Sequence, residues 1–232
     1  MTGPALDETV DDSVSAADAI GWLHEEGLTR LAALGAAALA PPVAHTVDVA
    51  TGIVTSYPAS DGSVGADSTT VAADDLPAPV AQPHRLVIVG ITTGEQLLVV
   101  DLSGSLVLGI LGDHPELAAR SWVTQLLLTP DVTVTTNSPQ VAIGDSPRCR
   151  KSFIPGGGGA IVSVDDGRPP VTTVSMNPEA AGSDYLDVFA DGTGEMYLGA
   201  RVWPLRLVST IADGPWAALA RTLSGEGGPA AG

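Results

Sequence analysis

The chain has 232 residues, of which 44% are hydrophobic and 4% aromatic, and it carries a formal net charge of -17. This length predicts one or two domains with a core built from aliphatic side chains. The negative charge argues against nucleic acid as a partner, because it repels phosphate backbones. The single cysteine, Cys149, excludes an intrachain disulfide and any metal cluster built on cysteines. We therefore expect neither a metal nor a cofactor.

The first part of the chain is strongly acidic. Residues 1–83 contain 12 acidic residues and one basic residue, Arg30. We expect residues 1–14 to be a disordered acidic tail, which lacks the basic start of a secretory signal. The apolar run at residues 31–40 is about half as long as a membrane span. These features predict a cytoplasmic chain without a transmembrane segment, at most peripheral to an envelope or secretion complex.

Residues 15–57 are predicted to form a small N-terminal segment, with helices first and a β-hairpin after them. An apolar stripe favours helix over residues 15–40, and Glu26-Gly27 is a plausible helix end that would divide it into two short helices. The stretch from His45 to Tyr57 has a β-rich composition, with a turn at Thr51-Gly52.

Residues 58–84 are rich in Asp, Ser, Ala and Pro, a composition that predicts a flexible linker. The main domain is expected to cover residues 85–223. It opens with a hairpin that turns at Thr93-Gly94, followed by a strand over residues 105–111 and a helix over residues 114–128. This helix is expected to cross over to a parallel strand near Val132, as in a βαβ unit.

The second half of the main domain is predicted to be rich in strands and to end in a helix. Six strands are expected, followed by a helix over residues 215–223 and a disordered tail over residues 224–232. The strands are expected at residues 140–144, 150–154, 160–165, 171–176, 185–190 and 195–209. The fold class is therefore α+β (mixed α/β), with a largely antiparallel sheet, one crossover helix and a C-terminal helix.

The junction at Gly112-Asp113 has the position of a phosphate-binding loop but not its composition. An apolar strand runs into the turn and a helix follows at once, which is where nucleotide-binding folds place a Gly-rich loop. No Gly-Lys-Ser/Thr follows here. Asp113 is expected to cap the helix with its own carboxylate, so that negative charge fills the anion site. An unusual ligand pocket is the alternative.

The only dense positive patch lies at Arg148, Arg150 and Lys151, just before four consecutive glycines at residues 156–159. A mobile loop that includes Gly157 could hold a phosphate or a carboxylate beside these cations. A charged strand edge with a flexible hairpin loop is the favoured interpretation. Cys149 lies between two arginines, but a structural thiol is the commoner outcome, and the sequence contains no Gly-x-Ser-x-Gly motif. No residue is predicted to be catalytic.

Large aromatic side chains offer another class of candidate sites. Trp122, Trp203 and Trp216 are expected to anchor the core. An exposed Trp203 before Pro204 would instead mark a docking surface. Trp22 in the N-terminal helix could pack on the main domain or bind a partner helix.

Three stretches of the main domain, RLVIVGITTGEQLLVVDLSGSLVLGILGD, SWVTQLLLTPDVTVTTNSPQ and YLGARVWPL, carry a family resemblance. Over residues 85–222 the chain resembles uncharacterised mycobacterial and other actinobacterial conserved proteins associated with type VII secretion loci. It is also distantly similar to a domain of actinobacterial LysM-containing regulators. An actinobacterial source agrees with the single lysine, Lys151, beside nine arginines. The resemblance implies an accessory role and transfers no active-site residue.

Together these observations favour a non-catalytic accessory or protein-interaction protein, with a protein partner in a type VII secretion or cell-envelope assembly. The alternative is a small-ligand binding protein or an enzyme that uses residues 148–151 and 156–159. Neither the oligomeric state nor the partner follows from the sequence.

Overall fold

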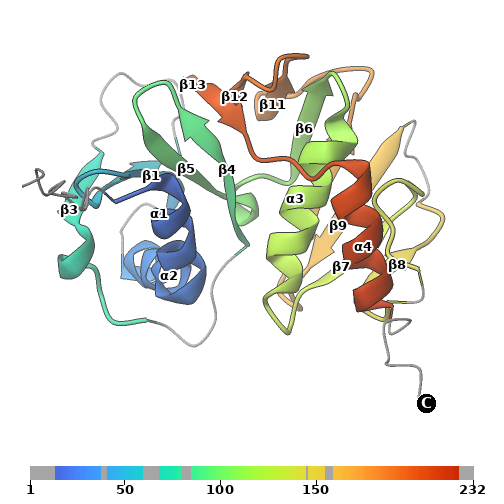
Figure 1. Ribbon diagram of the computed structural model, residues 1–232, viewed down its shortest axis with the longest axis horizontal. Coiled ribbons are helices and arrows are strands. Elements are labelled where there is room, and N and C mark those ends of the chain that lie inside the picture. The colour runs from blue at the N-terminus through green and yellow to red at the C-terminus, as the bar shows by residue number, and fades with distance from the viewer. Residues whose placement is uncertain are drawn as a thin grey trace, which may run out of the picture.

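The protein is an α+β fold, as predicted, built on one large and mostly antiparallel sheet (Figure 1). The computed structural model describes residues 14–37, 41–59, 68–79, 85–144, 146–154 and 159–224. Within these ranges the sheet has 13 strands, in the order β3-β2-β1-β5-β4-β13-β12-β11-β6-β10-β9-β7-β8. The parallel pairs are β6 with β10, β6 with β11, and β7 with β8. The predicted tails at residues 1–14 and 224–232 lie outside the described residues, apart from Val14 and Ser224.

The N-terminal helical segment is continuous rather than broken. Helix α1 (Ala16–Trp22) passes through a π-helical turn, η1 (Leu23–Gly27), into α2 (Leu28–Ala37). Ser15 begins it with a capping box to Asp18, which satisfies free amides of the first turn. The predicted break at Glu26-Gly27 is wrong because Gly27 has a packing role instead. A Cβ at Gly27 would lie 2.9 Å from the Trp22 ring, so the glycine makes room for the indole.

The predicted N-terminal hairpin is confirmed as β1 (Pro42–Asp48) and β2 (Ile53–Pro58). The predicted linker, residues 58–84, is different from the expectation where the structure describes it. Strand β3 (Thr69–Ala72) pairs with β2, and the 3-10 turn η2 (Ala73–Asp75) follows. Arg30 donates hydrogen bonds to the carbonyls of Asp74, Leu76 and Pro77. These bonds tie the segment to α2, which a composition rich in Asp, Ala and Pro did not indicate.

The predicted hairpin at Thr93-Gly94 is also confirmed, as β4 (Leu86–Thr92) and β5 (Gln96–Asp101), with the short turn η3 (Leu102–Gly104) after it. Strand β5 pairs with β1, so one sheet joins residues 15–57 to residues 85–223. Every residue of β4 is buried. Side chains on one face enter a core with α1 and α2, and those on the other face enter a core with α3 (Pro115–Leu127). In Figure 1, β4 lies between these two groups of helices.

The predicted crossover exists but spans more of the sheet than a βαβ unit of adjacent strands. Strand β6 (Val107–Gly112) leads into α3 (Pro115–Leu127) and then β7 (Thr133–Thr136). The pairings make β7 parallel to β6 in direction, with β10 and β9 between them. The helix therefore covers these two intervening strands on its way to β7.

The remaining strands mostly lie where they were predicted. They are β8 (Cys149–Lys151), β9 (Ala160–Asp165), β10 (Thr172–Met176), β11 (Tyr185–Val188), β12 (Gly194–Leu198) and β13 (Arg201–Val208), and helix α4 (Asp213–Leu223) follows. The single strand predicted over residues 195–209 is a hairpin that turns at Gly199, which has a positive φ of 56°. The strand predicted over residues 140–144 is a series of turns.

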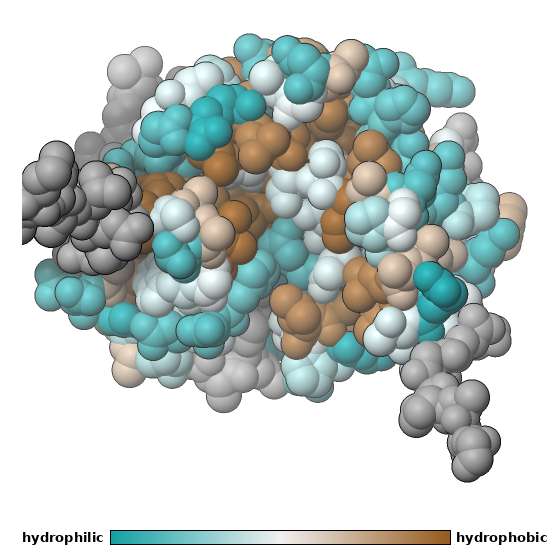
Figure 2. Space-filling view, in the orientation of Figure 1, coloured by the Kyte–Doolittle hydropathy of each residue, from teal (hydrophilic) through white to brown (hydrophobic). Residues whose placement is uncertain are grey.

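The two helical layers lie on opposite faces of the sheet. Helices α1 and α2 pack on one face of β1, β2, β4 and β5, whereas the core beneath α3 and α4 on the other face includes residues of β4, β5 and the strands that follow. The sheet is also strongly curved, because Tyr57 of β2 meets Trp203 of β13 edge-to-face, with centroids 5.4 Å apart. Figure 2 shows apolar surface in the hollow between the N-terminal helices and α3.

Candidate functional site

The turn after β6 does not provide an open site for an anion. Helix α3 begins at Pro115, and its N-cap is His114 in a left-handed conformation. The expectation that Asp113 caps the helix is therefore wrong; its side chain is exposed, and the acid in the first turn is Glu116, which contacts His114. The backbone N–H of Asp113 donates to Val188 O at 2.9 Å.

The backbone of Gly112 is also fixed by hydrogen bonds. Its N–H donates to the Asn177 side-chain oxygen at 3.0 Å, and the Asn177 amide donates back to its carbonyl at 3.2 Å. A Cβ at Gly112 would lie 2.1 Å from Val188 O, so the glycine allows close packing of strands. Two amides that could have received a phosphate already have partners, one on the Asn177 side chain and one on β11.

The predicted anion-binding patch has mainly a structural role in the described residues. Arg148 donates to three carbonyls at the end of α3, those of Leu127, Thr129 and Pro130, at 2.6, 2.8 and 3.2 Å. Its charge thereby satisfies the negative end of the helix dipole. These contacts do not support the expectation that Arg148 binds a ligand. The sequence could not indicate this, because it does not show which groups a guanidinium already contacts.

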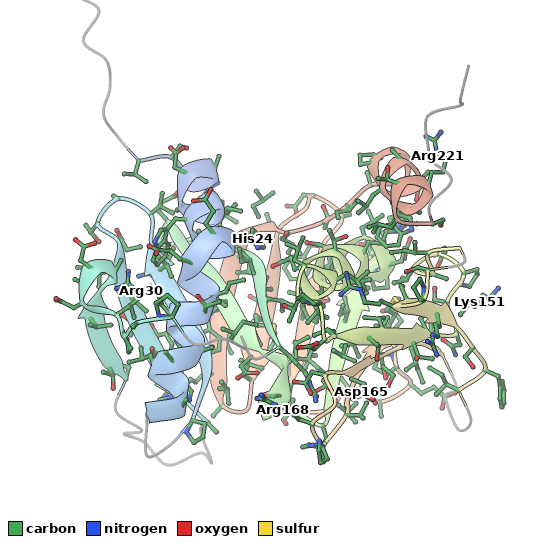
Figure 3. The ribbon with its side chains drawn as sticks, turned by 90° about the horizontal axis from the view of Figure 1, so that it is seen from below. His24, Arg30, Lys151, Asp165, Arg168 and Arg221 are labelled. Carbon is green, nitrogen blue, oxygen red and sulfur yellow. The ribbon has the colours of Figure 1, made fainter. Side chains whose placement is uncertain are left out.

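The other members of that patch are separated from one another. Arg150 is exposed and donates to Pro147 O at 2.7 Å. Lys151 points away from the molecule at the end of the sheet (Figure 3). Cys149 between them is fully buried, and this burial raises the pKa of the thiol, which makes it unreactive. Gly157 lies outside the described residues.

The tryptophans are mainly parts of the core, as predicted. Trp122, Trp203 and Trp216 are all buried, and the ring contact with Tyr57 occupies Trp203. The alternative of Trp203 as an exposed docking residue is therefore not supported. Trp22 is half-buried, donates its indole N–H to Glu26 at 2.9 Å, and lines a cleft of about 410 Å³ between α1 and the β1–β2 turn.

A cluster that the sequence analysis missed lies on the sheet face opposite α3 and α4. Two rows of side chains run there across β6, β11, β12 and β13. The aromatic row pairs Tyr185 with Tyr197, and the acidic row beside it pairs Asp187 with Glu195. Gly109 and Val202 complete the first row, and Leu111 and Pro204 complete the second. We call these two rows the acidic–aromatic face.

Side chains of this face lie in direct contact with one another. The rings of Tyr185 and Tyr197 stack with centroids 4.4 Å apart. The Tyr197 hydroxyl donates to Glu195, which raises the pKa of Tyr197 to about 12. Alternate residues of the same strands, among them Leu186 and Met196, point into the core beneath α3.

The acidic row is electrostatically unfavourable. Asp187 and Glu195 are direct cross-strand partners, an arrangement that destabilises a sheet when both are charged. The pKa of Asp187 is raised, first by partial burial and then by the charges of Glu195 and Asp113. A cationic group placed on the row would relieve this repulsion.

A signal for this cluster was present in the sequence. Tyr-x-Asp at residues 185–187 and Glu-x-Tyr at residues 195–197 lie symmetrically about the Asp191-Gly192 turn, which had been predicted correctly. A hairpin centred on this turn pairs the two tyrosines with each other and the two acidic residues with each other.

No protein-family model, curated protein or solved structure matches this chain. In the described part of the chain no helix is both long and apolar enough to cross a membrane. The same residues include no group of three His, Cys, Asp or Glu side chains arranged to hold a metal ion.

Proposed function

We propose that this chain is a non-catalytic protein-interaction protein that binds a basic segment of a partner protein on the acidic–aromatic face. The observation that carries the proposal is the direct pairing of Asp187 with Glu195 beside two stacked tyrosines. Like charges cost stability in the free protein, and a guanidinium or ammonium group would offset that cost. Aromatic side chains next to carboxylates add cation–π attraction and apolar contact area.

The surroundings of the two rows support an extended peptide as the bound segment. Val202 and Val107 are 47% and 59% exposed, and both belong to strands of this face. An extended segment with alternating basic and apolar residues could place its charges over Asp187 and Glu195 and its apolar side chains beside the valines. The net charge of -17 would speed the approach of such a segment.

The contacts of the other candidates argue against the alternative of an anion-binding protein or enzyme. The amides of Gly112 and Asp113 donate to the Asn177 side chain and to Val188 O, and the Arg148 guanidinium is bonded to the end of α3. The Cys149 thiol is buried. A partner in a type VII secretion or cell-envelope assembly stays part of the proposal, and it depends on the sequence resemblance alone.

A peptide titration tests the proposal. An arginine–valine pentapeptide with alternating residues is added to the ¹⁵N-labelled full chain, and amide shifts are followed by NMR. We expect saturable shifts on β11, β12 and β13, weakened by salt because exposed charges are screened. A glutamate–valine pentapeptide should cause none.

The control variants separate this face from general charge attraction. Asp187→Asn with Glu195→Gln should weaken binding at least fivefold. Glu25→Gln with Asp75→Asn removes the same charge from exposed positions elsewhere and should leave binding within twofold. Equal weakening in both double variants, or shifts that avoid β11 and β12, would refute the proposed face.

A further inference from the structure

A second cleft, on the other half of the molecule, has the properties of a small-molecule site. It has a volume of about 530 Å³ and lies between α2, the start of β1 and η3. This volume is within the range of known ligand pockets, about 300–1,000 Å³. Most of the wall is apolar and small, including Leu31, Gly35, Ala36, Pro42 and Val43. Three polar side chains also line it, those of His45, Asp101 and Ser103.

Among the described residues, one ring nitrogen of His45 has no hydrogen-bond partner. The side chain is 1% exposed, and Nδ1 lies 2.8 Å from Ser56 Oγ. Ser56 is buried, and in the described part of the chain its hydroxyl has no other partner, so it is satisfied by donating to Nδ1. The neutral ring then carries its proton on Nε2. Because Nδ1 is turned to Ser56, Nε2 is the donor left for a molecule in the cleft.

Asp101 provides an acceptor near this donor. His45 of β1 pairs with Val99 of β5, and Asp101 lies two residues further along the same face of β5. Diagonal neighbours of this kind are on the order of 7 Å apart. Oδ1 of Asp101 accepts from the Ser103 amide and hydroxyl at 2.8 and 2.6 Å. Among the described residues, Oδ2 has no hydrogen-bond partner.

We infer that this cleft binds a neutral, largely apolar molecule that carries a hydroxyl group. The hydroxyl oxygen accepts from His45 Nε2–H, and its proton is donated to Asp101 Oδ2. The apolar part of the molecule lies against Leu31, Pro42 and Val43. A carboxylate or phosphate is disfavoured, because Asp101 and the overall charge of -17 repel it. The site is separate from the acidic–aromatic face, and neither proposal depends on the other.

Three matched probes test the chemistry of the cleft: 1-naphthalenemethanol, 1-methylnaphthalene and 1-naphthoate. Each is titrated into the full chain at pH 7, and binding is followed by NMR. The alcohol should bind about three- to tenfold more tightly than the hydrocarbon, because one or two hydrogen bonds contribute a free energy of this size. Naphthoate should bind more weakly than either. Equal affinity of alcohol and hydrocarbon, or no saturable binding of the alcohol, overturns the inference.

A cavity-filling variant tests the location without touching the buried polar groups. A Cβ at Gly35 would lie 3.5 Å from Pro42, an ordinary contact, so Gly35→Leu can fill the cleft with the fold retained. It should weaken binding of 1-naphthalenemethanol at least tenfold. Gly21→Leu is the matched control in the same helical segment, since Gly21 is exposed with nothing near its Cβ position. Affinity within twofold of the unaltered chain in Gly35→Leu contradicts the site, as does an equal loss in Gly21→Leu.

The tautomer of His45 gives an independent readout. Long-range ¹H–¹⁵N spectra of the ring should show a protonated Nε2 in the free protein, and its signal should shift when 1-naphthalenemethanol binds. A protonated Nδ1, or an Nε2 signal that does not change at saturation, overturns the assignment of His45 as the donor.

Discussion

The N-terminal and C-terminal halves of the sheet are covered in different ways. Strands β4 and β5 have a core on each face, one beneath α1 and α2 and the other beneath α3. Strands β11, β12 and β13 have a core on one face, and on the other they present tyrosines, carboxylates and exposed apolar residues. Burial on two faces requires apolar residues throughout, whereas burial on one face leaves alternate positions free for binding.

The difference explains where each proposed site can lie. In the N-terminal half, a polar residue such as His45 is tolerated because Ser56 bonds it and a cleft adjoins it. In the C-terminal half, Asp187 and Glu195 stand directly opposite each other because solvent reaches their face. The two halves therefore suit different ligands, a neutral apolar molecule and a basic segment.

The largest expected effect comes from breaking the buried ion pair that joins β4 to the loop before β10. Arg85 is 2% exposed and donates to Asp166 Oδ1 at 2.6 Å, and also to the carbonyls of Arg168 and Pro170 and the Thr172 hydroxyl. Burial opposes ionisation of Asp166, yet its hydrogen bond with Arg85 leaves the pKa below its usual value. Arg85→Ala should lower the free energy of unfolding by about 3–5 kcal/mol, measured by urea denaturation.

The double variant Arg85→Met with Asp166→Leu serves as its control. Removing both charges leaves no unpaired buried ion and should recover at least half of the loss. A loss under about 1 kcal/mol in Arg85→Ala would show that water replaces the guanidinium and that this contact does not hold the loop.

Leucine truncations compare the two halves directly. Leu97 and Leu98 are adjacent in β5, and both are fully buried, on opposite faces. Each change to Ala should lower the free energy of unfolding by about 2–5 kcal/mol. Leu205 and Leu207 in β13 are 2% and 48% exposed. Leu205→Ala should cost as much as the β5 changes, whereas Leu207→Ala should cost less than about 1 kcal/mol.

Denaturation curves for the four variants are the measurement. Similar losses at Leu205 and Leu207 would mean that another element covers the second face of β13. That result would remove the basis for an accessible acidic–aromatic face. A large difference between Leu97 and Leu98 would instead contradict burial of β5 on both faces.

The sequence predicts the elements that depend on local signals better than the pairing of distant strands. The unbroken apolar stretches of β4 and β5 and the turns at Thr93-Gly94 and Asp191-Gly192 are local signals, and the strands they predict were found. Local patterns do not state which strands become neighbours, so the insertion of β10 and β9 between β6 and β7 was missed. The pairing of β3 with β2 was missed too, because long-range pairing overrode a loop-like composition.

An expected effect of similar size to a single truncation concerns pH and the N-terminal half. Burial lowers the pKa of His45 from 6.5 to about 4. Between these values the unfolded chain binds a proton that the folded chain does not, so the free energy of unfolding falls as the pH falls. The loss between pH 6.5 and pH 4 should be on the order of 3 kcal/mol.

Urea denaturation of the chain and of His45→Gln across this window measures the effect. The variant should lose less stability than the unaltered chain on acidification, even if it is less stable at pH 7. Parallel curves for the two proteins would show that His45 is protonated in the folded state, contrary to its burial.

A smaller effect distinguishes the two arginines that flank Cys149. Arg148→Ala removes hydrogen bonds to three carbonyls and should cost about 1.5 kcal/mol. Arg150→Ala removes one exposed contact and should stay within about 0.5 kcal/mol. Thermal melting with and without inorganic phosphate measures both. A phosphate-dependent stabilisation that either change abolishes would restore the anion site predicted from the sequence.

The candidate sites were harder to predict than the fold for a similar reason. Composition identified Arg148, Asp113 and Trp203 by residue type, but their partners come from segments distant in the sequence. Val188 O meets Asp113, and Tyr57 meets Trp203. The acidic–aromatic face depends on a register that only the paired strands reveal.

One urea-denaturation experiment on Asp187→Asn tests directly whether the acidic row is kept for binding at a cost in stability. The raised pKa of Asp187 means that its charge destabilises the folded chain at neutral pH. The variant alone should therefore gain about 0.5 kcal/mol in free energy of unfolding. The arginine–valine pentapeptide should stabilise the unaltered chain more than the variant. A variant that is less stable, or one that the peptide stabilises equally, would contradict the account.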